Sequence, residues 1–296
     1  MSTSNKKKKP REGMVENPTL GGKIYNIINV VFLGLVIFAC LMPLWHTLMS
    51  SLSDGQILMG KSGLVVWPEG GFNLGGYKLL FRDRKIIEGF INTFIYVIAI
   101  TGVGFVINCL AGYVLSRPTK LKPILTFLII FSMLFNGGII PLYMVVKTLG
   151  LVGTRWAVIL PTCTSGMFMI LMMNAFMQVP KETVEAAKID GAGHIRLLFK
   201  VMLPQAMGLA LVTIINTAIM AYNAWYEASI FVPTQKHLWP LQLWVNELTA
   251  VNENFLNYAN PDFNRYLIQF AIIIASILPI LILLPFVQEK LEKNTT

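Results

Sequence analysis

Charged residues are scarce in this chain of 296 residues. They make up 13% of the sequence and apolar residues 55%, whereas soluble domains contain about 25% charged residues. So few charges cannot cover a folded surface that faces water. Uncharged stretches recur along nearly the whole length, which leaves no room for a separate soluble domain. The composition therefore predicts a single membrane-embedded domain.

Cysteine and histidine are also scarce, with three of each. The cysteines all lie in uncharged stretches, where a thiol packs as a small apolar group, so a disulfide framework is not expected. The histidines are scattered without the spacing of metal ligands, so a metal site is not expected either. These residues are Cys40, Cys109, Cys163, His46, His194 and His237.

The formal net charge is +9, which raises the question of nucleic-acid binding. No recognition fold is visible, and Lys6–Lys9 precede the first apolar stretch, as lysines do at cytoplasmic membrane flanks. This start also looks like a signal peptide, but the apolar stretch is too long and no small-residue cleavage site follows it. We expect a basic cytoplasmic segment, 1–23, a retained first helix and no nucleic-acid partner.

Six uncharged windows can each hold the roughly 20 residues that a helix needs to cross the hydrocarbon core. Spanning segments must satisfy their own backbone hydrogen bonds, and no alternating pattern indicates a barrel. The sequence thus predicts an all-α polytopic membrane protein with six transmembrane helices in 24–289 and a short tail, 290–296. Most of the 24 basic residues share the side of the N-terminus, so both termini are expected in the cytoplasm. The windows are Ile24–Ser53, Gly89–Ser116, Pro123–Val146, Trp156–Pro180, Val201–Tyr226 and Tyr266–Gln288.

The segment 179–204, between the fourth and fifth windows, carries the most informative pattern. Pro180 suits a first helical position, and Glu182 suits the positive end of the helix dipole. These residues predict a short helix, which Gly191 and Gly193 should end.

A second short helix is expected to follow, with Asp190 as its N-cap. Pro204 should then open the fifth span. The apolar face of this second helix is expected to consist of Leu197, Leu198, Val201 and Met202.

Small side chains make this segment a candidate docking element. Ala186, Ala187 and Gly191 would let another protein approach the backbone closely, and Glu185 and Asp190 add fixed charge. From the residues alone, a docking element and an ordinary solvated amphipathic loop both remain open.

The segment closely resembles the EAA loop of ABC importer permeases, whose pattern is Glu-Ala-Ala, two residues, Asp-Gly-Ala, and later Leu-Pro. This chain has Glu185–Ala187, Asp190–Ala192 and Leu203–Pro204 at those positions. In that family the loop forms coupling helices that sit in a cleft of the cytoplasmic ATPase. The resemblance implies an ATPase-coupling surface made of Glu185, Ala186, Ala187, Asp190, Gly191 and Ala192.

The resemblance covers most of the chain and narrows to the maltose-type carbohydrate permeases, in particular the polysaccharide and oligosaccharide permeases typical of Gram-positive bacteria. This chain departs from the subgroup at two places. Tyr222 stands where the subgroup usually has tryptophan, and the glycine- and lysine-containing tail usual in the subgroup does not follow Gln288. The segments that carry the resemblance are Phe135–Tyr143, Gly150–Leu151 with Trp156 and Leu160–Pro161, Tyr222–Tyr226 and Pro240–Leu243.

The resemblance implies a type I ABC importer permease fold in the bacterial plasma membrane and an alternating-access mechanism. It also implies three kinds of partner besides membrane lipid: a second homologous permease, two cytoplasmic ATPase subunits, and an extracytoplasmic sugar-binding lipoprotein. ATP and magnesium would bind the ATPase subunits. This chain is expected to hold no cofactor and to catalyse no covalent chemistry, and the sequence does not name the sugar.

Uncharged polar and aromatic residues inside the windows are candidates for the sugar path. Buried amides cost free energy unless they are paired, so they should face the bundle interior or a wet cavity. A single asparagine more often bonds a neighbouring helix. Aromatics and amides concentrate, however, within two helical turns near the outer half of the fifth span. The candidate path residues are Asn136, Asn223, Trp225, Tyr226 and Glu227.

The stretch Gly55–Ser62 matches the pattern of a phosphate-binding P-loop. A P-loop follows a buried strand and opens a helix, whereas this match follows a predicted span and falls on the predicted outer side. We therefore expect no ATP binding here and expect the loop to pack on the permease surface.

Two other classes of membrane protein are alternatives. An ion-driven secondary transporter would need acidic or basic relay residues inside the membrane, and the six windows contain none. A non-transporting structural protein would tolerate changes at Glu185 or Gly191. Neither alternative explains the EAA pattern.

Overall fold

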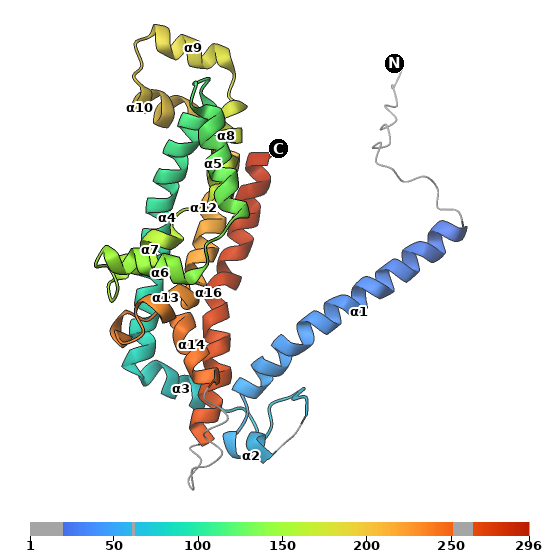
Figure 1. The fold of residues 1–296 in the computed structure, drawn as a ribbon. Helices are drawn as coiled ribbons and strands as arrows, with labels where there is room; N and C mark the ends of the chain where they lie inside the picture. The colour runs from blue at the N-terminus through green and yellow to red at the C-terminus, as the bar shows by residue number, and fades with distance from the viewer. Residues whose placement is uncertain (1–19, 61–62, 251–262, 296) are drawn as a thin grey trace, which may run out of the picture.

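The computed structural model describes residues 20–60, 63–250 and 263–295, and all regular structure in these ranges is helical. Figure 1 shows an elongated bundle, from which the first helix leans away. The three longest helices, of 32 or 33 residues each, are α1 (Leu20–Ser51), α4 (Arg84–Ser116) and α16 (Phe263–Thr295).

Shorter helices complete the bundle and its two ends. Those within the bundle and at the end that carries α3 are α2 (Gly55–Gly60), α3 (Gly75–Arg82), α5 (Lys122–Leu134), α6 (Ile139–Thr148), α7 (Arg155–Thr162), α8 (Gly166–Met177), α12 (Met207–Tyr222), α13 (Trp225–Phe231), the 3-10 helix η2 (Lys236–Leu238) and α14 (Leu241–Ala250). The connection from α8 to α12 contains α9 (Lys181–Ile189), α10 (His194–Arg196), the π-helix η1 (Leu197–Met202) and α11 (Leu203–Gln205).

All six windows are helical, so the prediction of an all-α polytopic fold is confirmed. Three of them are broken rather than single helices. The bends are 117° between α5 and α6, 50° between α7 and α8, and 91° between His194–Gln205 and α12. By length and composition two of the described helices can each cross a membrane, or up to five if each bent pair counts as one span. The sixth window contains the shorter apolar stretch Leu267–Leu283.

The break in the third window is built from Asn136 and Gly138. The Asn136 side-chain oxygen accepts a hydrogen bond from the Gly138 N–H at 2.9 Å, and Gly138 has a φ of 83°. Glycine adopts this left-handed conformation without the steric cost of a Cβ. The chain therefore turns sharply here, and α6 starts in a new direction.

The fifth window begins later than predicted. The prediction that Pro204 opens the span is wrong, because Pro204 lies in α11 and the chain bends at Ala206 before α12 starts at Met207. The physical reason is burial: Leu197 and Leu198 are each 1% exposed and Met202 is 3% exposed. The predicted apolar face packs on the bundle and holds η1 across its end, so α12 must start after a turn.

Helix α4 packs along α8 and α12. Two glycines allow the close approach. A Cβ at Gly104 would collide with the carbonyl oxygen of Cys163, and one at Gly112 would lie 2.6 Å from the Cβ of Met172. Small residues at a helix contact let backbones approach closely, which is how transmembrane helices gain packing energy.

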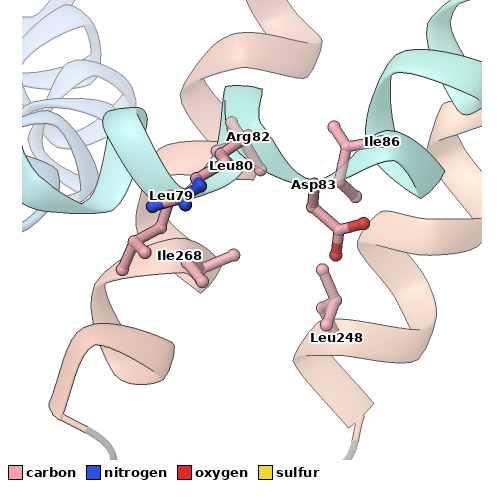
Figure 2. A pocket seen from close by; sticks show the side chains of 7 residues that line it. All are labelled: Leu79, Leu80, Arg82, Asp83, Ile86, Leu248 and Ile268. Atoms are coloured by element: carbon pink, nitrogen blue, oxygen red, sulfur yellow. The ribbon is translucent and has the colours of Figure 1, made fainter.

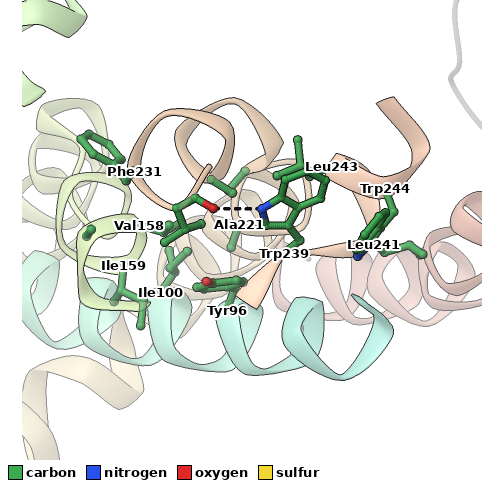
Figure 3. Close-up of a cluster of buried hydrophobic side chains, with 14 of the residues drawn as sticks. Tyr96, Ile100, Val158, Ile159, Ala221, Phe231, Trp239, Leu241, Leu243 and Trp244 are labelled. Carbon is green, nitrogen blue, oxygen red and sulfur yellow. Dashed lines mark hydrogen bonds between the residues drawn. The ribbon is translucent and has the colours of Figure 1, made fainter. Parts of the chain in front are cut away.

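A large apolar cluster fills the half of the bundle that lies away from α9. Figure 3 shows Tyr96 and Ile100 of α4 near Val158 of α7 and the indole of Trp239, with the indole of Trp244 farther along, beside Leu241. The Trp239 ring N–H donates to the Val232 carbonyl at 2.9 Å. The cluster therefore joins the segment before α14 to α4 and α7.

The two ends of the bundle carry different elements. Figure 1 places α9 and α10 at one end and α2 and α3 at the other, with the start of α1 and the end of α16 toward the α9 end. The P-loop-like match forms α2 up to Gly60, directly after α1; Lys61 and Ser62 fall outside the described residues. No strand occurs in the described ranges, so this match lacks the strand that a P-loop follows.

Among the described residues, helix α1 touches the bundle only through its last turns. Met49 packs with Leu58 of α2, Val65 and Leu267 of α16, but none of the most apolar 18-residue stretch of α1 is buried. Such a surface is stable only against lipid or another apolar protein surface.

We predict that Asn92→Ala destabilises the bundle by about 1–3 kcal/mol, because several buried polar groups lose their partner. The Asn92 amide N–H donates to the carbonyls of His237 at 2.7 Å and Trp239 at 3.1 Å, and its oxygen accepts from Arg155 at 2.7 Å. The measurement is the thermal unfolding midpoint in detergent. Asn216→Ala is the control, since the exposed Asn216 side chain bonds a carbonyl of its own helix. Equal midpoints for the two variants would contradict the prediction.

Candidate coupling surface and translocation path

Helix α9 ends where the glycines predict. The N–H of Asp190 bonds the Ala186 carbonyl at 3.0 Å, the N–H of Gly191 bonds Lys188 at 3.0 Å, and the N–H of Ala192 bonds Ala187 at 2.9 Å. Gly191 has a φ of 74°, the left-handed conformation that commonly ends a helix. The turn after α9 is thus fixed by its own backbone.

Two details of the predicted capping are wrong. Pro180 is the N-cap of α9 rather than its first helical residue. Asp190 is the C-cap of α9, and Gly193 is the N-cap of α10. Asp190 cannot cap the second helix because its φ of −73° and ψ of 8° continue the turn of α9, whereas Gly193 is extended, as an N-cap residue usually is.

The predicted coupling residues form a largely exposed surface at the end of the bundle. Val184 is buried and Ala187 is half-buried, so one side of α9 rests on the apolar cluster of the bundle end. The outward side of the element is formed by Glu185, Ala186, Asp190 and Gly191, which are exposed, with Ala192 half-buried beside them.

Two isoleucines on this surface were not singled out from the sequence. Ile189 is 87% exposed and Ile195 is 74% exposed. They lie on a segment that also carries Lys181, Glu182 and Lys188, so they do not face the lipid core. Large apolar side chains on a water-facing projection indicate a protein contact. The sequence signal was an isoleucine directly before Asp190 and another after His194.

The candidate path residue Asn136 has a local structural role. It is exposed in the break between α5 and α6, where its side chain holds Gly138. No hydrogen bond or ring contact within the described ranges joins it to the other candidate path residues.

The other candidate path residues do not lie on the fifth span. Helix α12 ends at Tyr222, and the Trp225 N–H donates to the Asn223 carbonyl at 2.8 Å, which turns the chain into α13. The expectation that they share two turns of one helix is therefore wrong. The turn still keeps them adjacent: the Trp225 and Tyr226 rings meet edge to face at 5.9 Å.

The exposure of this group is uneven. Asn223 is exposed, Trp225 is 37% exposed, Tyr226 is 48% exposed and Glu227 is half-buried. Within one turn of the start of α13 the chain thus presents two aromatic faces, an amide and a carboxylate. Aromatic faces and polar groups of this kind suit contact with a sugar.

A cavity of about 320 Å³ lies elsewhere, at the corner between α3 and α4 and next to α14 and α16. Figure 2 shows mostly aliphatic side chains around it, with the charged groups of Arg82 and Asp83 as its polar part. None of the candidate path residues lines it, and it offers no amide or aromatic side chain for a sugar. Its lining residues are Leu79, Leu80, Arg82, Asp83, Ile86, Leu248 and Ile268.

Comparison with known proteins places this geometry in a family. Residues 81–296 match the family described as the binding-protein-dependent transport system inner membrane component. Protein LplC of Bacillus subtilis is 31% identical over 93% of this chain and 94% of its own length. The polygalacturonan/rhamnogalacturonan transport system permease protein YtcP of the same organism is 28% identical over 92% of this chain and 96% of its own length.

The fold matches that of a solved transporter. A crystal structure of a bacterial ABC transporter involved in the import of the acidic polysaccharide alginate contains a chain that superposes with a TM-score of 0.82. The match covers 93% of this chain and 99% of that one, at 24% sequence identity. With this fold, the family match and the EAA-type element at one end of the bundle, the chain belongs to the inner-membrane components of binding-protein-dependent transport systems, the non-catalytic permease subunits of ABC importers.

Proposed function

We propose that this chain is a permease subunit of an ATP-driven oligosaccharide importer. Support comes from the names of similar proteins: YtcP is named for polygalacturonan and rhamnogalacturonan, AraQ of Halalkalibacterium halodurans for arabinooligosaccharides, and MdxG of Bacillus subtilis for maltodextrin. All of these substrates are chains of sugar units, and they differ in which sugar forms the unit. The substrate class proposed is therefore an oligosaccharide of several units.

The observation that carries the proposal is the projecting surface of α9 and α10. Ile189 and Ile195 are exposed next to the charges of Glu185 and Asp190, on an element that the bundle holds from one side only. Burial of an isoleucine contributes about 1.5–3 kcal/mol, so a partner that covers both gains substantial binding energy. We assign the cytoplasmic ATPase to this surface and hence place the α9 end, with both termini, in the cytoplasm.

The opposite end then faces the external sugar-binding lipoprotein. The sugar would pass between this chain and a second, homologous permease, with the group from Asn223 to Glu227 on this chain's side of the path. The long exposed apolar surface of α1 suits lipid together with that second permease. ATP and magnesium bind in the two ATPase subunits, whose cycle moves the permeases.

The coupling surface is tested by Ile189→Glu in an affinity-tagged chain expressed in its native host. We expect the ATPase subunit that co-purifies with this chain to fall about tenfold or more, because a charge replaces the most exposed apolar contact and a loss of 1.4 kcal/mol lowers affinity tenfold. Thr119→Glu is the matched control, since it adds the same charge at an exposed position after α4, at the same end of the bundle. Co-purification equal to that of the control would contradict ATPase docking at this surface.

The substrate class is tested separately by deleting the gene and measuring uptake of labelled oligogalacturonides, arabino-oligosaccharides and maltodextrins. We expect uptake of one of these to be lost and restored by the wild-type gene. Unchanged uptake of every oligosaccharide would contradict the proposed substrate class without affecting the family assignment.

A further inference from the structure

A hydrogen bond joins the end of α4 to the first residue of α10. The Tyr113 hydroxyl lies 2.8 Å from Nδ1 of His194, and the two rings meet edge to face at 6.0 Å. His194 lies three residues after Gly191. It is therefore where the chain contacts the bundle again after the proposed coupling surface. Tyr113 is only 7% exposed, three residues before the end of α4.

Arg117 holds the Tyr113 side chain from the other side. Its guanidinium donates to the Tyr113 hydroxyl at 3.1 Å and lies 4.7 Å from the centre of the Tyr113 ring. The Arg117 Nε is buried and has no hydrogen-bond partner within the described residues. The tyrosine is thus fixed between a cation that directly follows its own helix and the histidine of the coupling element.

This polar contact differs in kind from most of the contact between the coupling element and the bundle. Leu197, Leu198 and Met202 are buried against apolar neighbours, together with Val184 of α9, and one further polar contact joins the Arg117 guanidinium to the Met202 sulfur at 3.5 Å. Apolar burial is non-directional, so such a contact resists separation but fixes rotation and sliding poorly. A hydrogen bond depends steeply on angle and distance. The Tyr113–His194 bond therefore fixes where the coupling element stands relative to α4.

The far part of α4 makes a second set of polar contacts, with the segment that leads from α13 into the first residue of α14. Besides the Asn92 bonds described above, the Tyr96 hydroxyl donates to the Leu238 carbonyl at 3.0 Å, and the Leu241 N–H donates to the Thr93 hydroxyl at 2.8 Å. We call these contacts of Asn92, Thr93 and Tyr96 the outer clamp. Helix α4 is continuous from the outer clamp to Tyr113 and contains no proline, which makes a rod of about 30 Å at 1.5 Å per residue.

We propose that Tyr113 and His194 form the joint through which movement of the coupling surface moves α4 and, through it, the outer clamp. Both are positioning residues, since neither lies among the candidate substrate contacts. When the ATPase displaces α9, His194 moves with it. The hydrogen bond transmits this displacement to the end of α4. Because the helix is rigid, the segment from His237 to Leu241 at its other end moves as well. The inference rests on the proposed ATPase docking and adds how the docked motion reaches the opposite end.

The test uses the complete importer, purified through a tag on this chain and reconstituted in liposomes. An introduced cysteine, Thr234→Cys, reports on the exposed loop before the outer clamp. The exposed Cys40 is replaced by alanine, and the two remaining cysteines, Cys109 and Cys163, are buried. Its labelling rate with a membrane-impermeant maleimide is compared without nucleotide and after trapping of the ATPase with ATP and vanadate. In the otherwise unchanged chain, trapping is expected to change this rate several-fold.

Tyr113→Phe and His194→Ala are each expected to remove most of that change while the amount of trapped nucleotide stays the same. The double variant should lose no more than the more affected single variant, because both remove one bond. His194→Gln keeps a side chain that can hydrogen-bond and should restore part of the change. Tyr25→Phe removes a hydroxyl from exposed α1 and should behave as the unchanged chain.

If trapping changes the labelling rate fully in both Tyr113→Phe and His194→Ala, the proposed joint is wrong. Additive losses in the double variant would also overturn it, because they would show that the two residues act independently. Failure of the proposed function gives a different result: without a docked ATPase, even the unchanged chain traps no nucleotide and shows no change in labelling.

Discussion

Replacing Gly104 by alanine is expected to cost about 3 kcal/mol of folding free energy, the upper part of the range for overpacked sites, and to leave little folded permease in the membrane. The added methyl group would collide with the carbonyl oxygen of Cys163, in the break between α7 and α8. A backbone atom cannot move aside as a flexible side chain can. Helix α4 and the broken fourth span would have to separate along their length.

Gly102→Ala provides a matched control two residues away on the same helix. A Cβ at Gly102 meets nothing within 4 Å, and alanine has a higher helix propensity than glycine. The measurement is the amount of monodisperse protein after detergent extraction, together with its thermal unfolding midpoint. Similar values for the two variants would show that α4 and α7 are not packed as closely as the structure has them.

The sequence predicted that the six windows are helical, because hydrophobicity and helix formation in the membrane depend on local composition. It did not predict where the spans break. The turn at Asn136 to Gly138 depends on one side-chain hydrogen bond and one left-handed glycine, and glycines are common in unbroken spans as well. Helix α12 ends at Tyr222, so Trp225, Tyr226 and Glu227 lie outside the fifth span. No periodicity in that window indicated this helix end.

For the coupling element, local backbone chemistry and burial explain what succeeded and what failed. Gly191 was correctly identified as a helix end, because a left-handed residue there is strongly favoured to be glycine. Asp190 was misassigned since aspartate suits both helix caps and turns. Ile189 and Ile195 were overlooked because an isoleucine in sequence reads as buried, and only the structure shows that the bundle leaves both uncovered.

Gly191→Pro is expected to lower oligosaccharide uptake and the associated ATP hydrolysis about tenfold or more. Proline fixes φ near −65°, whereas Gly191 has a φ of 74°. It also removes the N–H that bonds the Lys188 carbonyl, and it disfavours the turn conformation of Asp190 before it. The end of α9 must therefore refold, which moves Glu185 and Ile189 relative to His194.

The matched control is Gly193→Pro, the same substitution two residues later in the same loop. Gly193 already has a φ of −67°, and no atom lies within 4 Å of a Cβ placed there. The bundle itself does not depend on the turn at Gly191, so both variants should assemble with the second permease to wild-type levels. If Gly191→Pro assembles, transports and hydrolyses ATP as Gly193→Pro does, the geometry of this turn has no part in coupling, and the ATPase must dock on another surface. Loss of both activities with intact assembly is the result that a coupling surface requires, because only there does the shape of one exposed loop control a reaction carried out by another subunit.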